Sequence, residues 1–154
     1  MLEILLIGDK NLSLKDLEKV NHIGSTKSYY CDDLRYVVEF GDVISARKHR
    51  HLLGLSKNHL VGSYADHIRY VFGTSSEEWV FLEFSEEDMA KVPFKAEVFI
   101  IMEFRHKETM KRILRQLDFP QNIYVEDNYG SILPLSEFNK LDWKPGMGNI
   151  YPKD

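Results

Sequence analysis

Two adjacent acidic residues in the last third of the sequence are the first place to look for chemistry. They lie in the stretch Tyr124 to Gly130, which reads YVEDNYG. A carboxylate pair can serve acid–base catalysis, but Glu126 and Asp127 would point to opposite faces of a strand because they are adjacent. A calcium loop is disfavoured too, since too few oxygen ligands follow at the required spacing. The stretch instead predicts a hairpin turn, with Asn128 and Gly130 at positions that tolerate positive φ.

Acidic and aromatic side chains are mixed around this turn, which suggests a surface that binds another protein. Tyrosine and tryptophan are enriched at the energetic centres of protein interfaces. A platform for single-stranded nucleic acid would place basic residues between its aromatic side chains, whereas the neighbours here are acids. The predicted partner-binding residues are Glu126, Asp127, Tyr129, Asp142 and Trp143.

Histidines are concentrated in the segment 49–67, which offers an alternative site. The stretch 46–51 reads ARKHRH, and His59 and His67 follow it. His49 and His51 would not share a helical face, and none of the spacings matches a familiar metal motif. A solvated basic surface is therefore the expected interpretation, with no metal and no cofactor. An enzyme or small-ligand domain that uses this segment is the alternative.

The single cysteine gives little indication of catalysis. Cys31 precedes Asp32 and Asp33, and neighbouring carboxylates make a thiol less available as a thiolate. One cysteine cannot form an intramolecular disulfide, which favours a reducing compartment. The first residues contain a short apolar run interrupted by Glu3, so we expect a strand there rather than a signal peptide, and a cytoplasmic protein.

Composition and charge narrow the classes of function further. The 154 residues suit one domain, and 44% hydrophobic with 29% charged residues is ordinary globular composition. A net charge of −4 disfavours non-specific nucleic-acid binding and suits a basic partner. No apolar run approaches the roughly 20 residues of a membrane span, so no membrane association is expected.

The first half of the chain predicts strands with one clear helix. We expect strands at 2–7 and 34–40, and a helix that begins after Ser13, has Asp16 at the capping-box spacing and ends near Gly24. The segment 43–53 is ambiguous, with a helix favoured over a hairpin strand. The segments 65–72 and 78–84 predict a second hairpin, because WVFLEF is rich in strand-forming residues.

The last third gives the clearest pattern. A short helix is expected after Ser85, stopped by Pro93, and a buried strand at 98–104. The segment 107–117 has the apolar spacing of a helix, with basic residues opposite, and strands at 123–126 and 132–133 and a helix at 136–141 follow. A strand–helix–strand crossover favours parallel pairing.

Together these elements predict an α+β or α/β fold. We expect one domain over 1–142, followed by a C-terminal tail at 143–154. A mixed sheet would carry helices on one or both faces, and a strand–helix–strand–hairpin unit would end the domain.

The stretches FIIMEFRHKETMKRILRQL and NIYVEDNYGSILPLSEF, in the C-terminal third of the chain, are similar to small cytoplasmic immunity proteins that bacteria pair with secreted or contact-delivered toxins. The resemblance implies a non-enzymatic protein that blocks one cognate toxin, often a basic nuclease, through an acidic surface. In that case the acids would steer the basic partner, and Tyr129 and Trp143 would anchor it.

Overall fold

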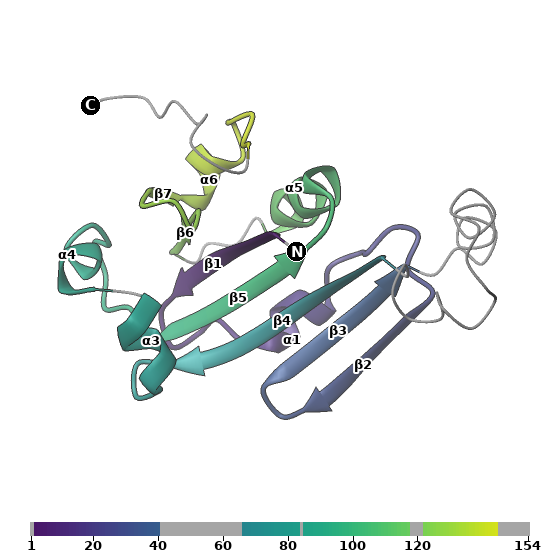
Figure 1. The fold of residues 1–154 in the computed structure, drawn as a ribbon, viewed down its shortest axis with the longest axis horizontal. Coiled ribbons are helices and arrows are strands. Elements are labelled where there is room, and N and C mark those ends of the chain that lie inside the picture. Colours follow the sequence, from purple (N-terminus) through teal and green to yellow (C-terminus); the bar gives the residue numbers. More distant parts are fainter. Residues whose placement is uncertain (1, 41–65, 84, 118–121, 145–154) are drawn as a thin grey trace, which may run out of the picture.

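A computed structural model describes residues 2–40, 66–83, 85–117 and 122–144 of the chain (Figure 1). Within these ranges one sheet contains seven strands: β1 (Leu2–Gly8), β2 (Lys27–Asp32), β3 (Arg35–Phe40), β4 (Asp66–Thr74), β5 (Val98–Phe104), β6 (Ile123–Glu126) and β7 (Ile132–Pro134). The described helices are short: α1 (Leu14–Glu18), α3 (Glu78–Glu83), α4 (Glu86–Met89), α5 (Lys107–Gln116) and α6 (Leu135–Phe138). The fold is a single-domain α+β fold in which the sheet dominates, one of the two predicted classes.

The strand order is β2-β3-β4-β5-β1-β6-β7, and every neighbouring pair is antiparallel. The parallel pairing expected for the unit β5-α5-β6 is therefore wrong. These two strands do run in the same direction, but β1 lies between them and pairs antiparallel with both. The crossover through α5 passes over one intervening strand, so the N-terminal segment occupies the position that direct pairing would have filled.

Helices cover both faces of the sheet, as predicted. One face carries the larger core, in which the side chains of Ile4, Leu6 and Met102 pack with buried side chains of α1, α5 and α6. The opposite face carries a smaller core around Leu5 and Phe99, covered by α3 and the turn after α4. Alternate residues of β1 and β5 thus serve different cores, because successive side chains of a strand point to opposite faces.

Several local predictions are confirmed. Ser13 and Ser85 each precede a helix and complete a capping box with the acid three residues on, which satisfies amides that the first turn leaves free. The strand at 98–104 and the helix at 107–116 lie where the pattern placed them. Asn128 and Gly130 both have positive φ, of 67° and 93°.

The strand expected at 78–84 is wrong, because residues 78–83 form helix α3. A hairpin partner for β4 would need a free edge, but β4 is already paired with β3 on one side and β5 on the other. Val80 is buried in the smaller core, and the indole of Trp79 lies against the backbone of Gly73. A short apolar run alone does not distinguish a strand from a buried helix.

Two further differences concern the edge of the sheet and the end of the domain. Strand β2 was not predicted; it is an edge strand with every residue exposed, so it lacks the apolar alternation that marks a half-buried strand. Trp143, placed in a separate tail, is a core residue, so the packed domain extends past position 142. The ambiguous segment 43–53 lies outside the described residues.

None of the described helices has the length and apolar character needed to cross a membrane.

Candidate functional site

The acid pair of the β6–β7 turn is turned inward. Asp127 is only 1% exposed, and its Oδ1 accepts hydrogen bonds from the amides of Tyr129 at 2.8 Å and Ser131 at 3.0 Å. Glu126 is also buried, and its Oε1 accepts a 2.8 Å hydrogen bond from the amide of Asn128. Both carboxylates therefore hold the turn together, and their prediction as an exposed acidic patch needs correction.

The other three predicted residues do not gather into one surface either. Trp143 is 2% exposed and packs edge-on against Phe104, so it cannot anchor a partner from the surface. Asp142 is exposed and lies 3.4 Å from the ammonium group of Lys107. Tyr129 is half exposed at the tip of the turn. Of the five predicted residues, only Tyr129 and Asp142 are available to a partner without rearrangement.

A surface with the expected mixture of acids and aromatic side chains exists elsewhere, between α1 and the β2–β3 hairpin. We call it the α1 groove. It is an open hollow of about 870 Å³. Its lining comprises Ser13, Leu14, Lys15, Glu18, Tyr30, Asp32, Asp33, Leu34 and Phe72. The α1 groove lies towards the β2 edge of the sheet, because Tyr30 and Asp32 of β2 line it together with residues of α1.

Apolar side chains contribute much of the α1 groove. Tyr30 is 42% exposed and Leu34 is 44% exposed, and both are among the few large apolar side chains of the described residues that reach the surface. The Leu34 carbonyl accepts a 2.8 Å hydrogen bond from the amide of Phe72, which ties the hairpin turn to β4. An exposed leucine alone needs no explanation, but one grouped with aromatic side chains and rimmed by charges is typical of a binding surface.

The rim of the α1 groove is acidic. Glu18, Asp32 and Asp33 line it, against one cation, Lys15. Asp32 also lies 3.4 Å from the Arg35 guanidinium in an exposed pair and accepts a hydrogen bond from the Leu34 amide. These contacts hold Asp32 in place and partly neutralise it. The lining as a whole keeps an excess of negative charge that favours a cationic partner.

Tyr30 links the α1 groove to the core. Its hydroxyl donates a 2.8 Å hydrogen bond to Glu18 Oε2, and its ring lies 4.9 Å from that of Tyr36. Tyr36 in turn stacks on Tyr70, so three tyrosines lie in register across β2, β3 and β4. Burial and the Glu18 carboxylate raise the pKa of Tyr30 to about 12. The phenol therefore stays neutral near pH 7 and acts as a hydrogen-bonding aromatic surface rather than a base.

His22 ends this row of tyrosines on the core side. Its Nε2 lies 2.8 Å from the buried Tyr70 hydroxyl, and its ring also contacts Phe40. Burial lowers the pKa of His22, and a hydrogen bond with the Val20 backbone opposes that shift. The hydrogen bond between this buried histidine and the buried phenol of Tyr70 joins the segment after α1 to the sheet.

The described part of the chain holds no group of three or more metal-binding side chains. The alternative site was built on the histidines of segment 49–67. His49, His51 and His59 lie outside the described residues, so the structure locates only His67. His67 is on β4, opposite Glu39 of β3. Cys31 is an exposed free thiol on the edge strand.

The α1 groove had a signal in the sequence. Two tyrosines, a cysteine and two aspartates stand together at 29–33, directly before the strand at 35–40. Consecutive aspartates before a β-rich run are typical of a hairpin turn, which would have indicated the missed strand. The contribution of α1 to the groove could not be predicted from the local sequence, because Glu18 and Tyr30 come into contact only after the chain folds.

Searches against protein-family models, curated proteins and solved structures found no match to this chain. Its α+β class follows from the fold, and the α1 groove is the surface from which a function can be argued.

Proposed function

We propose that this chain is a non-enzymatic protein-binding module that docks a basic partner in the α1 groove. The observation that carries the proposal is the grouping of exposed Tyr30 and Leu34 with the carboxylates of Glu18, Asp32 and Asp33. Aromatic and aliphatic anchors would supply the binding energy, while the acids would steer and orient a positively charged partner.

The most concrete form of this proposal is a bacterial immunity protein that occludes a cognate basic toxin domain in the cytoplasm. The net charge of −4, the single cysteine and the resemblance of the C-terminal third support that form. The groove is built by the N-terminal half of the chain. The proposal therefore assigns binding to residues outside the stretches that carry the resemblance.

The test uses as partner the product of a toxin-like reading frame beside the gene, which the immunity role predicts. The double substitution Glu18→Lys with Asp33→Lys is expected to weaken binding by about tenfold or more at low salt, and to reduce its dependence on salt. The matched control is Glu137→Lys with Asp142→Lys, which makes the same charge change on exposed residues away from the groove. Titration calorimetry at two salt concentrations measures both variants.

Two results would contradict the proposal in different ways. Equal weakening by the two double variants would show a general charge effect and no role for the α1 groove. Tight binding in the groove without loss of toxin activity would leave a protein-binding module and remove the immunity role.

A small-ligand domain is the second candidate, and one observation favours it. A separate cavity between α5 and α6 has the size of a small-molecule site. Its charged lining residues are cationic, whereas the rim of the α1 groove is acidic.

A further inference from the structure

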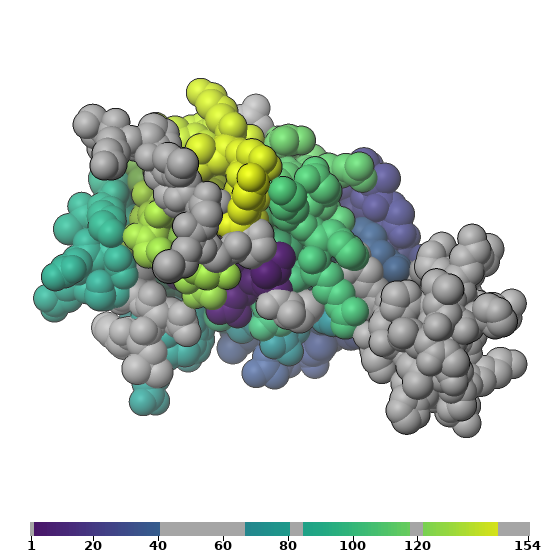
Figure 2. All heavy atoms as spheres, turned by 45° about the horizontal axis from the view of Figure 1, so that its top comes forward, coloured from purple at the N-terminus to yellow at the C-terminus, as the bar shows by residue number. Residues whose placement is uncertain are grey.

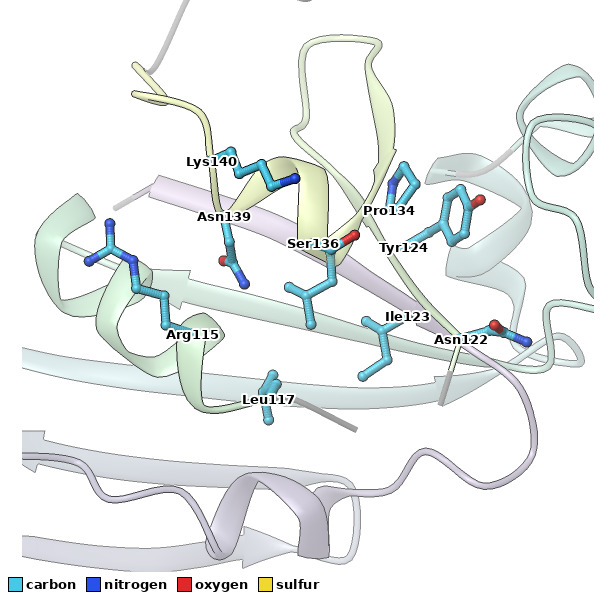
Figure 3. Close-up of a pocket in the computed structure, with 10 residues that line it drawn as sticks. Arg115, Leu117, Asn122, Ile123, Tyr124, Pro134, Ser136, Asn139 and Lys140 are labelled. Carbon is cyan, nitrogen blue, oxygen red and sulfur yellow. The ribbon is translucent and has the colours of Figure 1, made fainter. Parts of the chain in front are cut away.

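A second hollow of about 540 Å³ lies between the end of α5, the start of β6 and the end of α6 (Figure 3). Figure 2 shows the yellow α6 region beside the green α5 region on the same side of the molecule. Leu117, Ile123 and Leu135 give this cavity an apolar floor. A volume between about 300 and 1,000 Å³ is usual for sites that bind small organic molecules.

The rim of this cavity is cationic. Arg115 comes from α5, and Lys140 comes from the turn that follows α6. None of the described lining residues is acidic, although the chain as a whole has a net charge of −4. Within the described part of the chain, neither side chain is engaged in an ion pair, whereas the nearby Lys107 pairs with Asp142. Two cations that have no ion-pair partner among the described residues, beside an apolar floor, favour an anion with an organic body.

A buried lysine adds to the positive potential. Lys111, on the same helix as Arg115, donates a 2.7 Å hydrogen bond to the Phe138 carbonyl and thereby joins α5 to α6. Burial and the Arg115 charge lower the pKa of Lys111. Arg115 therefore lies close enough to Lys111 for its charge to disfavour a second positive charge there, while the carboxylates of Asp142 and Glu108 act in the opposite direction.

Asn139 lies in the wall of this cavity and joins the end of α6 to α5. Its Nδ2 donates a 3.3 Å hydrogen bond to the Leu114 carbonyl, which fixes the orientation of the amide. Its Oδ1 is buried and has no hydrogen-bond partner among the described residues. The Asn139 amide therefore braces the wall of the cavity, and its Oδ1 is not part of the surface that a bound molecule would meet.

We propose that this cavity binds a small organic anion, with a carboxylate or phosphate group neutralised by Arg115 and Lys140 and an apolar body over Leu117 and Ile123. The site is independent of the α1 groove, and its failure would leave the protein-binding proposal untouched. Arginine is suited to such a group because its planar donors match two oxygens of a carboxylate or phosphate.

The experiment is an amide chemical-shift titration of the full chain with phenyl phosphate, benzoate, inorganic phosphate and uncharged benzyl alcohol. We expect saturable shifts at the amides of Leu117, Ile123 and Asn139 with phenyl phosphate or benzoate, and weaker binding of inorganic phosphate because it lacks the apolar body. The stronger of the two aromatic anions identifies the preferred head group. Benzyl alcohol should bind at least about tenfold more weakly than that anion.

Arg115→Gln is expected to weaken binding of the preferred anion by about tenfold, and Lys140→Gln by a smaller factor. The matched control is Arg112→Gln, because Arg112 is exposed on the same helix and does not line the cavity. The same spectra report whether each variant remains folded. Absence of saturable shifts at the cavity with every anion, equal affinity for benzyl alcohol, or equal weakening by Arg112→Gln would each overturn the proposal.

Discussion

The Tyr30 hydroxyl lies 2.8 Å from Glu18 Oε2, and this hydrogen bond joins α1 to the outermost strand β2. This hydrogen bond also fixes the Tyr30 ring in the α1 groove, where the ring packs against that of Tyr36. A phenol that donates to a carboxylate resists ionisation, because the phenolate would face a negative charge and lose the hydrogen bond.

Glu18→Gln should lower the pKa of Tyr30 from about 12, since the charge is removed while burial, the larger cause, remains. The measurement is a titration of phenolate absorbance in the ultraviolet, with Tyr30→Phe used to assign the signal. The matched control is Glu39→Gln, which removes the carboxylate that accepts a 3.0 Å hydrogen bond from Tyr29. A change of the Tyr30 pKa in that variant, or none in Glu18→Gln, would contradict the assignment.

The second prediction concerns acid stability through His22. Burial holds the pKa of this histidine below its ordinary value of 6.5, so the unfolded chain binds its proton more readily than the folded chain. The contribution of His22 to the free energy of unfolding should therefore be fully present above about pH 6.5. It should decrease as the pH falls towards the lowered pKa of the folded state. His22→Gln removes this proton linkage while it keeps a polar side chain beside Tyr70.

Urea denaturation of both proteins between about pH 5 and pH 7.5 measures the difference. Because the two proteins differ only at position 22, the difference between the two curves isolates the contribution of His22. We expect the wild type to lose stability on acidification more steeply than the variant. Parallel curves would mean that His22 is protonated as readily in the folded chain as in the unfolded one.

How far the sequence predicted this fold depends on whether the deciding interactions were local. Helix α5 repeats its apolar residues at helical spacing, and the β6–β7 turn needs positive φ at Asn128 and Gly130; both were predicted correctly. Lys111 was expected on the solvent side of α5, yet it is buried and bonded to Phe138. A lysine can be buried when its ammonium group meets a carbonyl, and that partner comes from another element.

The prediction that the five binding residues form one exposed surface was wrong for a related reason. The carboxylate of an acid before a turn can be exposed to solvent, or it can accept hydrogen bonds from the amides of the turn. Residue composition alone does not distinguish these two arrangements. The α1 groove combines residues of α1, the β2–β3 hairpin and β4, and the cavity between α5 and α6 combines residues of several consecutive elements. Their pairings, such as Glu18 with Tyr30, depend on the strand order, which the sequence left open.

The third prediction tests the packing that made residues 78–83 a helix. A Cβ atom added at Gly73 would overlap the indole of Trp79, so Gly73→Ala should destabilise the fold by about 1–3 kcal/mol. Urea denaturation measures the loss. In the double variant Gly73→Ala with Trp79→Leu, the cost of the alanine should be smaller than in the wild-type background, because the overlapping ring is gone. Additive effects of the two changes would show that this contact does not set the position of α3.

The fourth prediction separates a structural role of the predicted acids from a role in binding. Asp127→Ala removes the acceptor of two backbone hydrogen bonds in the β6–β7 turn, and should cost about 2–3 kcal/mol in the free energy of unfolding. Asp142→Ala removes an acid that is 79% exposed, whose 3.4 Å contact with Lys107 is screened by solvent. Its effect should stay within about 0.5 kcal/mol.

Chemical denaturation gives the stability of both variants, and titration calorimetry with the proposed basic partner gives their affinity. If the carboxylate of Asp127 only holds the turn, Asp127→Ala will lower stability and leave the affinity of the folded protein close to that of the wild type. A variant of full stability that loses affinity would reverse this assignment. The β6–β7 turn, rather than the α1 groove, would then be the surface that meets the partner.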